Sequence, residues 1–173
     1  MAHSGKHHAG DARRIRCAIV TVSDTRTEVT DASGAEIRAR LEAAGHEVVE
    51  YRIVRDEPLL VRALVEDLAA AGEVEVMLLS GGTGIAPRDN TFEAVSGLLT
   101  KRIDGFGELF RSLSFEEIGS AAMLSRAVAG LVGTMSVFSM PGSTAACRLA
   151  MDKLVVPQLG HVVGLARPKA ATP

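Results

Sequence analysis

Strand and helix patterns alternate along the first half of this sequence, which restricts the chain to few folds. Residues rich in Ile and Val, alternating or nearly all apolar, indicate strands, and apolar residues at helical spacing follow the first two of them. A strand, a helix and a second strand of one sheet form a right-handed crossover, so this order predicts a parallel sheet. The predicted strands are 15–23, 46–54 and 74–79, and the helices between them start at a capping-box pattern, 33–36, and at Glu57-Pro58.

Later segments extend the same plan. Asn90 and Glu93 predict a helix start, with that helix running to about Thr100, and 136–140 reads as a further strand. A C-terminal helix then begins near Ser143. The predicted fold class is therefore α/β: a three-layer α/β/α domain with a mostly parallel, doubly wound sheet.

The 173 residues fit a single domain, and a hydrophobic content of 47% supplies its core. We expect a disordered N-terminal tail at 1–14, a domain at 15–165 and a C-terminal tail at 166–173. The tail histidines His3, His7 and His8 could bind a metal, but a solvated tail is the favoured interpretation.

Charge and composition argue against several function classes. A net charge of −2 with 3% aromatic residues disfavours nucleic-acid binding. No apolar run approaches the roughly 18 residues that span a membrane, so we expect no membrane partner and a cytoplasmic location. Cys17 and Cys147 are interpreted as buried small hydrophobes in a reducing compartment.

A glycine-rich loop follows the third strand. Gly81, Gly82 and Gly84 allow backbone N–H groups to approach a ligand closely, and an anion is the natural guest. The loop has neither the GxxxxGK[ST] pattern of a P-loop nor the GxGxxG pattern of a dinucleotide site.

Four polar segments follow predicted strands: Asp24, Asp56, the loop 81–89 and the turn 141–143. Ligands of open parallel sheets bind outside the carboxyl ends of the strands, so these segments should share one edge. Backbone N–H groups there could hold phosphates, and Asp56 with Asp89 could hold the Mg²⁺ that commonly bridges phosphate groups. A nucleoside triphosphate would then be the simplest ligand.

Structural interpretations compete with these roles. Each of Asp24, Asp56 and Asp89 could merely cap a helix, and Arg88 on its own is better read as a surface ion-pair partner. Ser143 is favoured as an N-cap over a nucleophile, because no G-x-S-x-G elbow surrounds it. His46 and His161 lack metal-ligand spacing and are read as structural.

Short motifs in a fixed order then carry a family resemblance over about 15–163. The sequence resembles the MoaB/MogA family of molybdenum cofactor biosynthesis, related to the gephyrin G domain. The motifs include Thr21-Val22-Ser23-Asp24, Gly81-Gly82-Thr83-Gly84, Arg88-Asp89, Gly105-Phe106-Gly107-Glu108, Leu124-Ser125-Arg126-Ala127 and Met140-Pro141-Gly142-Ser143.

The resemblance implies a protein that binds molybdopterin and, with Mg²⁺ and ATP, adenylylates it and releases pyrophosphate. The two aspartates essential in active relatives match Asp56 and Asp89, and the segment 140–143 resembles the MoaB branch. The alternatives are a non-catalytic molybdopterin-binding or scaffolding protein of that pathway, which works with other pathway proteins, and, more weakly, a CinA-like nucleotide hydrolase. The expected substrate- and nucleotide-binding residues are Ser23, Asp24, Gly81, Gly82, Thr83, Gly84, Arg88, Pro141, Gly142 and Ser143.

Oligomerisation is a further expectation. The segment 103–129 has more apolar positions than the predicted sheet needs, which favours a closed homo-oligomer. The resemblance implies a trimer or a hexamer.

Overall fold

The computed structural model describes residues 13–167. The predicted tails lie almost wholly outside this range, so the prediction of disorder at 1–14 stays a prediction. Arg13 and Arg14, which fall inside the range, lie beside Glu75 and Glu47 as ion-pair partners.

The elements are β1 (Arg16–Val22), α1 (Ala32–Ala43), β2 (Glu47–Val54), α2 (Pro58–Ala71), β3 (Val76–Ser80), α3 (Thr91–Ser96), β4 (Lys101–Arg102), α4 (Asp104–Ile118), the 3₁₀ helix η1 (Gly119–Leu124), β5 (Val128–Val132), β6 (Met135–Met140), α5 (Thr144–Ala150), the π-helical turn η2 (Met151–Val155) and α6 (Val156–Ala166).

The strands form one six-stranded sheet in the order β2-β1-β3-β6-β5-β4. The first four strands in that order are parallel, whereas β5 runs antiparallel to β6 and to β4. The predicted mostly parallel, doubly wound sheet is therefore confirmed.

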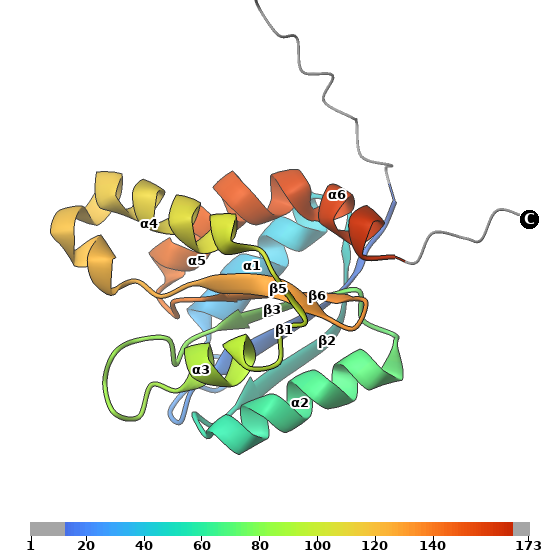
Figure 1. Cartoon of the computed structure of the whole chain (residues 1–173), viewed down its shortest axis with the longest axis horizontal. Coiled ribbons are helices and arrows are strands. Elements are labelled where there is room, and N and C mark those ends of the chain that lie inside the picture. The colour runs from blue at the N-terminus through green and yellow to red at the C-terminus, as the bar shows by residue number, and fades with distance from the viewer. Residues whose placement is uncertain (1–12, 168–173) are drawn as a thin grey trace, which may run out of the picture.

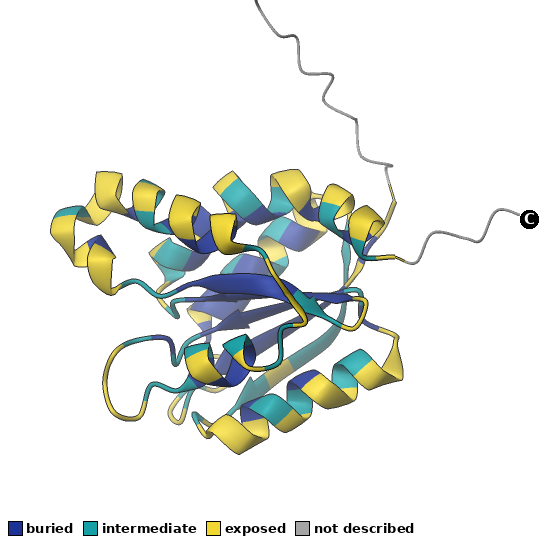
Figure 2. Ribbon diagram, viewed as in Figure 1, coloured by how far each residue is buried: buried dark blue, intermediate teal, exposed yellow. Residues whose placement is uncertain are grey.

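Helices cover both faces of the sheet, which makes the three layers visible in Figure 1. Helices α1, α4, α5 and α6 lie on one face, and α2 and α3 lie on the other. Strands β1, β2, β3, β5 and β6 contribute side chains to both cores: in β1, Cys17 and Ile19 face the first layer, and Ala18 and Val20 face the second. The central strands β1, β3 and β6 are accordingly the most deeply buried part of the molecule (Figure 2).

Two helix boundaries differ from the prediction. The N-cap of α1 is Asp31, whose carboxylate accepts from the Gly34 N–H, so the cap at Ser33 was predicted two residues too late. Helix α3 ends at Ser96 rather than near Thr100. Its N-cap residue, Asn90, makes no side-chain capping bond and donates instead to the carbonyls of Pro87 and Arg88.

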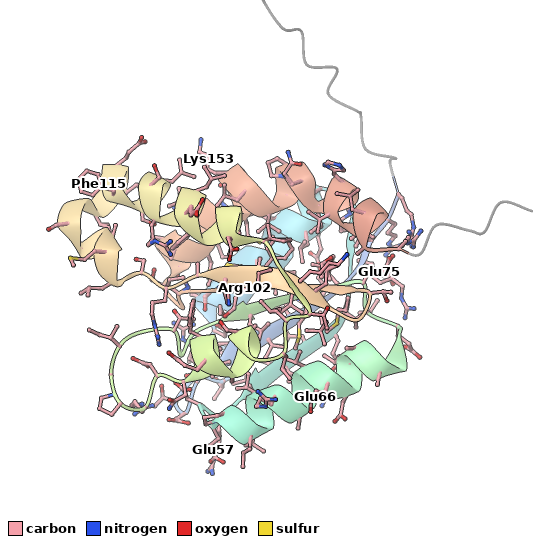
Figure 3. The ribbon with its side chains drawn as sticks, in the orientation of Figure 1. Glu57, Glu66, Glu75, Arg102, Phe115 and Lys153 are labelled. Atoms are coloured by element: carbon pink, nitrogen blue, oxygen red, sulfur yellow. The ribbon has the colours of Figure 1, made fainter. Side chains whose placement is uncertain are left out.

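The segment between α3 and β6 holds most of the structure that was not predicted. A short strand, a long helix and a 3₁₀ helix lead into the β5–β6 hairpin. Large apolar side chains remain exposed on α4 and η1, and Phe115 points outward there (Figure 3). These residues, which we call the α4–η1 surface, are Leu109, Phe115, Ile118, Met123 and Leu124.

The two ends of the described chain lie together at the edge of the sheet where β1 and β3 begin. Arg13 and Arg167 each pair with Glu75 at 2.7 Å, and Glu75 is at that edge in Figure 3. The carboxyl ends of the parallel strands form the opposite edge of the sheet, and the polar loops that follow these strands lie there. None of the helices in 13–167 has the length and apolar character needed to cross a membrane.

Candidate functional site

A pocket of about 600 Å³ opens at the carboxyl ends of the parallel strands. Its walls come from the ends of β1, β3 and β6 and from the start of the loop after η1. Strand order therefore assembles it, because β1, β3 and β6 are neighbours in the sheet although they are far apart in sequence. The lining residues are Val22, Ser23, Thr25, Arg26, Gly81, Gly82, Thr83, Gly84, Leu124, Ser125, Pro141, Gly142 and Ser143.

The glycine loop forms the floor of this pocket in a conformation that requires glycine. Gly81 and Gly82 have φ angles of 103° and 61°, which side chains rarely tolerate. The Gly81 N–H donates to the Met140 carbonyl at 3.1 Å, which ties the loop to β6. Among residues 13–167, no hydrogen bond uses the N–H groups of Gly82, Thr83 or Gly84. Three successive N–H groups are thus free to bind an anion.

Arg126 holds the loop from its other side. Its guanidinium donates to the carbonyl oxygens of Thr83 and Gly84, at 2.8 Å for Thr83, and lies 4.8 Å from the centre of the Phe92 ring. It also pairs with Glu93, and that hydrogen bond lowers the pKa of the Glu93 carboxyl. The carbonyl oxygens of Thr83 and Gly84 are therefore already bound by Arg126. Sequence reasoning quoted this arginine only as part of a motif and gave it no role.

Two predicted carboxylates lie against the glycine loop. A side chain on Gly82 would collide with Thr91 and would come within 2.8 Å of Asp56 Oδ1, and one on Gly84 would collide with Asp89. Within the described residues, Asp56 Oδ1 and Thr91 Oγ1 are both buried without a hydrogen-bond partner. Burial raises the pKa of Asp56, and the negative charges of Asp89 and Asp24 raise it further.

The carboxylate oxygens of Asp56 and Asp89 are of the type that a divalent cation binds. Magnesium prefers oxygen ligands and usually takes one or two carboxylates, with phosphates and water completing the shell. In the part of the chain that the structure describes, no three His, Cys, Asp or Glu side chains are grouped to hold a metal by themselves. Asp56 and Asp89 are the residues that could hold a Mg²⁺ together with a phosphate ligand.

Asp24 and Arg88 lie beside these carboxylates and pair with each other. Arg88 donates to Asp24 Oδ2 at 2.5 Å, and Asp24 Oδ1 accepts from the Asp56 N–H at 3.2 Å. Asp24 therefore connects the ends of β1 and β2 to the glycine loop. The carboxylates of Asp24, Asp56 and Asp89 cap no helix, so that alternative is not seen for any of them.

Two predicted serines line the pocket with their hydroxyls already in use as acceptors. Ser143 is the N-cap of α5 and accepts from the Ala146 N–H at 3.2 Å, which confirms the capping interpretation. Ser23 accepts from the N–H groups of Thr25 and Arg26 and so shapes the loop after β1. Both hydroxyls keep a hydrogen with which to bind a ligand.

Arg26 was missed by sequence reasoning, and it is the only charged side chain among the lining residues. It pairs with Asp31 at 3.1 Å and donates to the Gly142 carbonyl at 2.9 Å. Asp31 itself is buried and accepts from Thr21 and Tyr51, at 2.5 Å each, as well as from Ser33 and Gly34. Burial works against its ionisation, but these hydrogen bonds outweigh burial and lower the pKa of Asp31.

Eight of the predicted site residues thus line the pocket, and four lie beside it. The four are Asp24, Asp56, Arg88 and Asp89. The two cysteines are free and buried, as predicted, and burial raises the pKa of each thiol to about 12. Burial lowers the pKa of His46, and His161 is exposed on α6.

Known proteins are similar to this chain in sequence and in fold. A family model described as a probable molybdopterin binding domain matches residues 18–161. Molybdenum cofactor biosynthesis protein B of Halalkalibacterium halodurans is 52% identical over 159 residues, which is 91% of this chain and 94% of that protein. The tungsten cofactor synthesizing protein MoaB of Pyrococcus furiosus superposes with a TM-score of 0.80 at 34% identity, over 90% of this chain and 99% of that one. A MogA structure superposes with a TM-score of 0.79 at 30% identity, over 88% and 99%.

Proposed function

The chain belongs to the MoaB/MogA family of molybdenum cofactor biosynthesis proteins, and we propose that it adenylylates molybdopterin with MgATP and releases pyrophosphate. The observation that carries this proposal is Asp56 Oδ1, a buried carboxylate oxygen without a partner among the described residues, beside a loop with free N–H groups. Most buried side-chain oxygens have a hydrogen-bond partner, so this oxygen needs an explanation. An oxygen left free beside a phosphate-binding loop is suited to a phosphate-bound cation.

In the proposed reaction, an oxygen of the molybdopterin phosphate attacks the α-phosphorus of ATP. A new P–O bond forms, the bond between the α-phosphorus and the bridging oxygen breaks, and the electron pair leaves with pyrophosphate. No covalent bond to the protein is required, so the side chains contribute positioning and charge stabilisation.

The described residues divide this work. The N–H groups of Gly82, Thr83 and Gly84 would bind nucleotide phosphates, and Arg126 holds this loop through the carbonyls of Thr83 and Gly84. Asp56 and Asp89 would hold Mg²⁺, which when bound neutralises charge on the phosphates. Asp24 holds Asp56 in place through its backbone N–H and holds Arg88 through an ion pair. Pro141, Gly142 and Ser143 would form the wall for the pterin.

We also propose that the protein is a homo-oligomer, a trimer or a hexamer, joined through the α4–η1 surface. Phe115 and Met123 are 61% and 78% exposed, and an apolar hollow runs between them. Clustered apolar side chains of this kind mark protein interfaces. Sedimentation at micromolar concentration should show an assembly, and a monomer would contradict the proposal.

The substitution Asp89→Asn tests the enzymatic proposal. Asparagine keeps the shape of the side chain but removes the charge that would bind Mg²⁺. Pyrophosphate release from molybdopterin and MgATP should fall by a factor on the order of 10² or more, while molybdopterin binding and thermal stability stay near those of the wild type. Asp104→Asn is the matched control, because Asp104 is an exposed carboxylate at the start of α4.

Two results would overturn the proposal. Loss of stability in Asp89→Asn, with activity per folded molecule preserved, would make Asp89 a structural residue. Wild-type protein that binds molybdopterin but never consumes ATP would instead be a binding or scaffolding protein of the pathway. Folding, pterin binding and pyrophosphate release must therefore be measured on the same preparation.

A further inference from the structure

Charges of opposite sign lie around the pocket, on the two sides of the sheet. Asp56 precedes the N-cap residue of α2 and lies near Thr91, the first residue of α3, so the acidic side belongs to the α2 and α3 layer. Arg26 bonds to Asp31 and Ser33 at the start of α1, so the basic side belongs to the other layer (Figure 1). A ligand that spans the sheet edge would meet a cation site at one end and a fixed positive charge at the other.

The guanidinium of Arg26 is held rigidly. One terminal nitrogen, Nη1, donates to the Asp31 and Ser33 oxygens, and the other, Nη2, donates to the Gly142 carbonyl. Asp31 is fully buried as a side chain and is fixed by further donors, so it cannot move with its partner. Arg26 is therefore pre-organised before any ligand arrives, which lowers the entropy lost on binding.

Part of the guanidinium remains available. Nη1 is bound to Asp31 and Ser33 and Nη2 to Gly142, so the Nε–H and one of the two Nη2 hydrogens have no partner within residues 13–167. Nε and Nη2 are neighbouring nitrogens, and such a pair of donors matches two oxygens of a phosphate or carboxylate. The rest of the lining is uncharged, so an anion in the pocket finds its positive partner here.

We propose that Arg26 binds the phosphate monoester of the pterin substrate, and that Asp31 is the positioning residue that orients it. This assignment rests on the proposed function for the identity of the substrate. The carboxylates on the other side of the sheet edge favour the magnesium-bound triphosphate at their end, which leaves the metal-free phosphate for Arg26. The two phosphates would then approach each other above the glycine loop.

The experiment compares the variants Arg26→Gln and Arg26→Lys with the wild type in separate titrations of molybdopterin and MgATP. We expect the Kd for molybdopterin to rise at least 10-fold in Arg26→Gln and less in Arg26→Lys, which keeps the charge but loses the paired donors. The Kd for MgATP should change less than 3-fold. Arg148→Gln, which removes an exposed positive charge from α5 on the same side of the sheet, should change neither.

A second measurement uses only the wild type and inorganic phosphate. Phosphate should shift the ¹⁵Nε resonance of Arg26, and the shift should saturate, whereas the ¹⁵Nε resonance of Arg148 should not move. Unchanged molybdopterin affinity in Arg26→Gln, a weakening confined to MgATP, or an unperturbed Arg26 resonance would each overturn the assignment. If the wild type binds molybdopterin through Arg26 but releases no pyrophosphate, the proposed function fails and the assignment of Arg26 stands.

Discussion

Asp31 and Asp56 lie on opposite sides of the same sheet edge, and the surroundings of their carboxylates are opposite. Asp31 accepts hydrogen bonds with both oxygens, and these donors lower its pKa. Asp56 keeps one buried oxygen without a partner in the described chain, and burial with two neighbouring carboxylates raises its pKa. The hydrogen bonds of Asp31 stabilise the fold, whereas the Asp56 carboxylate has a negative charge that a cation can neutralise.

The difference separates two uses of the same residue type. Asp31 caps α1 and joins it to β1 and β2 through Thr21 and Tyr51, so it belongs to the framework. Asp56 makes no side-chain cap and lies against a glycine loop. Substitutions at the two positions should therefore affect different measurements.

Asp31→Ala should have the largest effect, which is a loss of stability. It removes the acceptor of several donors and leaves Arg26 without its buried partner. We expect the free energy of unfolding to fall by roughly 3 to 5 kcal/mol. Denaturant unfolding followed by circular dichroism measures it. A loss below about 1 kcal/mol would show that Asp31 is not part of the framework.

Asp56→Asn should show the opposite pattern. Stability should stay the same or rise by less than about 1 kcal/mol, because a repelled charge is removed. Pyrophosphate release should fall by a factor on the order of 10². Asp67→Asn on the exposed face of α2 is the control for loss of one charge. A variant Asp56→Asn that is destabilised but active would show that Asp56, like Asp31, stabilises the fold.

Gly82→Ala sharpens the comparison from the loop side. Gly82 has a φ of 61°, so alanine there costs about 1 kcal/mol, and its methyl group would press on Thr91 and the Asp56 carboxylate. We expect affinity for MgATP to fall on the order of 10-fold, equivalent to about 1.4 kcal/mol. Gly105→Ala at the start of α4, where a methyl group meets open space, should leave affinity unchanged. If Gly82→Ala and Gly105→Ala bind MgATP equally well, Gly82 is not part of the cation site.

Much of the fold could be predicted because its information is local. Strands β1, β2, β3 and β6 and helices α1 and α2 have clear periodicity, and the rule for parallel sheets then placed the glycine loop and the turn 141–143 on one edge. The segment 101–132 was not resolved into elements, because glycines interrupt its apolar pattern. Its hairpin depends on the pairing of β5 with β6, and its short strand depends on the pairing of β4 with β5, neither of which a local pattern specifies.

The site was predictable in the same measure. Asp56 and Asp89 follow from their places after strands and from the family resemblance. The role of Arg26 depends on the Gly142 carbonyl, which is 116 positions away, and Asp31 was passed over because Ser33 fits the capping pattern equally well. Sequence patterns show which residues begin or end an element, but the partner of a side chain across the sheet emerges only when the chain folds.

The pH dependence of stability gives the smallest effect and the most direct contrast between the two aspartates. The pKa of Asp31 is lowered from its ordinary 3.8, so its stabilisation is present above that value and is lost as the pH falls below it. The pKa of Asp56 is raised from 3.8, so the folded state holds this proton more tightly than the unfolded state, and stability decreases as the pH rises through the raised value.

In buffer with a chelator, the stability of Asp56→Asn relative to wild type should therefore increase from about pH 4 to pH 7, by less than about 1 kcal/mol. The deficit of Asp31→Asn should instead shrink below about pH 4, where the wild-type carboxylate also loses its charge. Parallel stability curves for wild type and Asp56→Asn would mean that Asp56 is not repelled by Asp89 and Asp24, and the reason for a cation between these carboxylates would disappear with that repulsion.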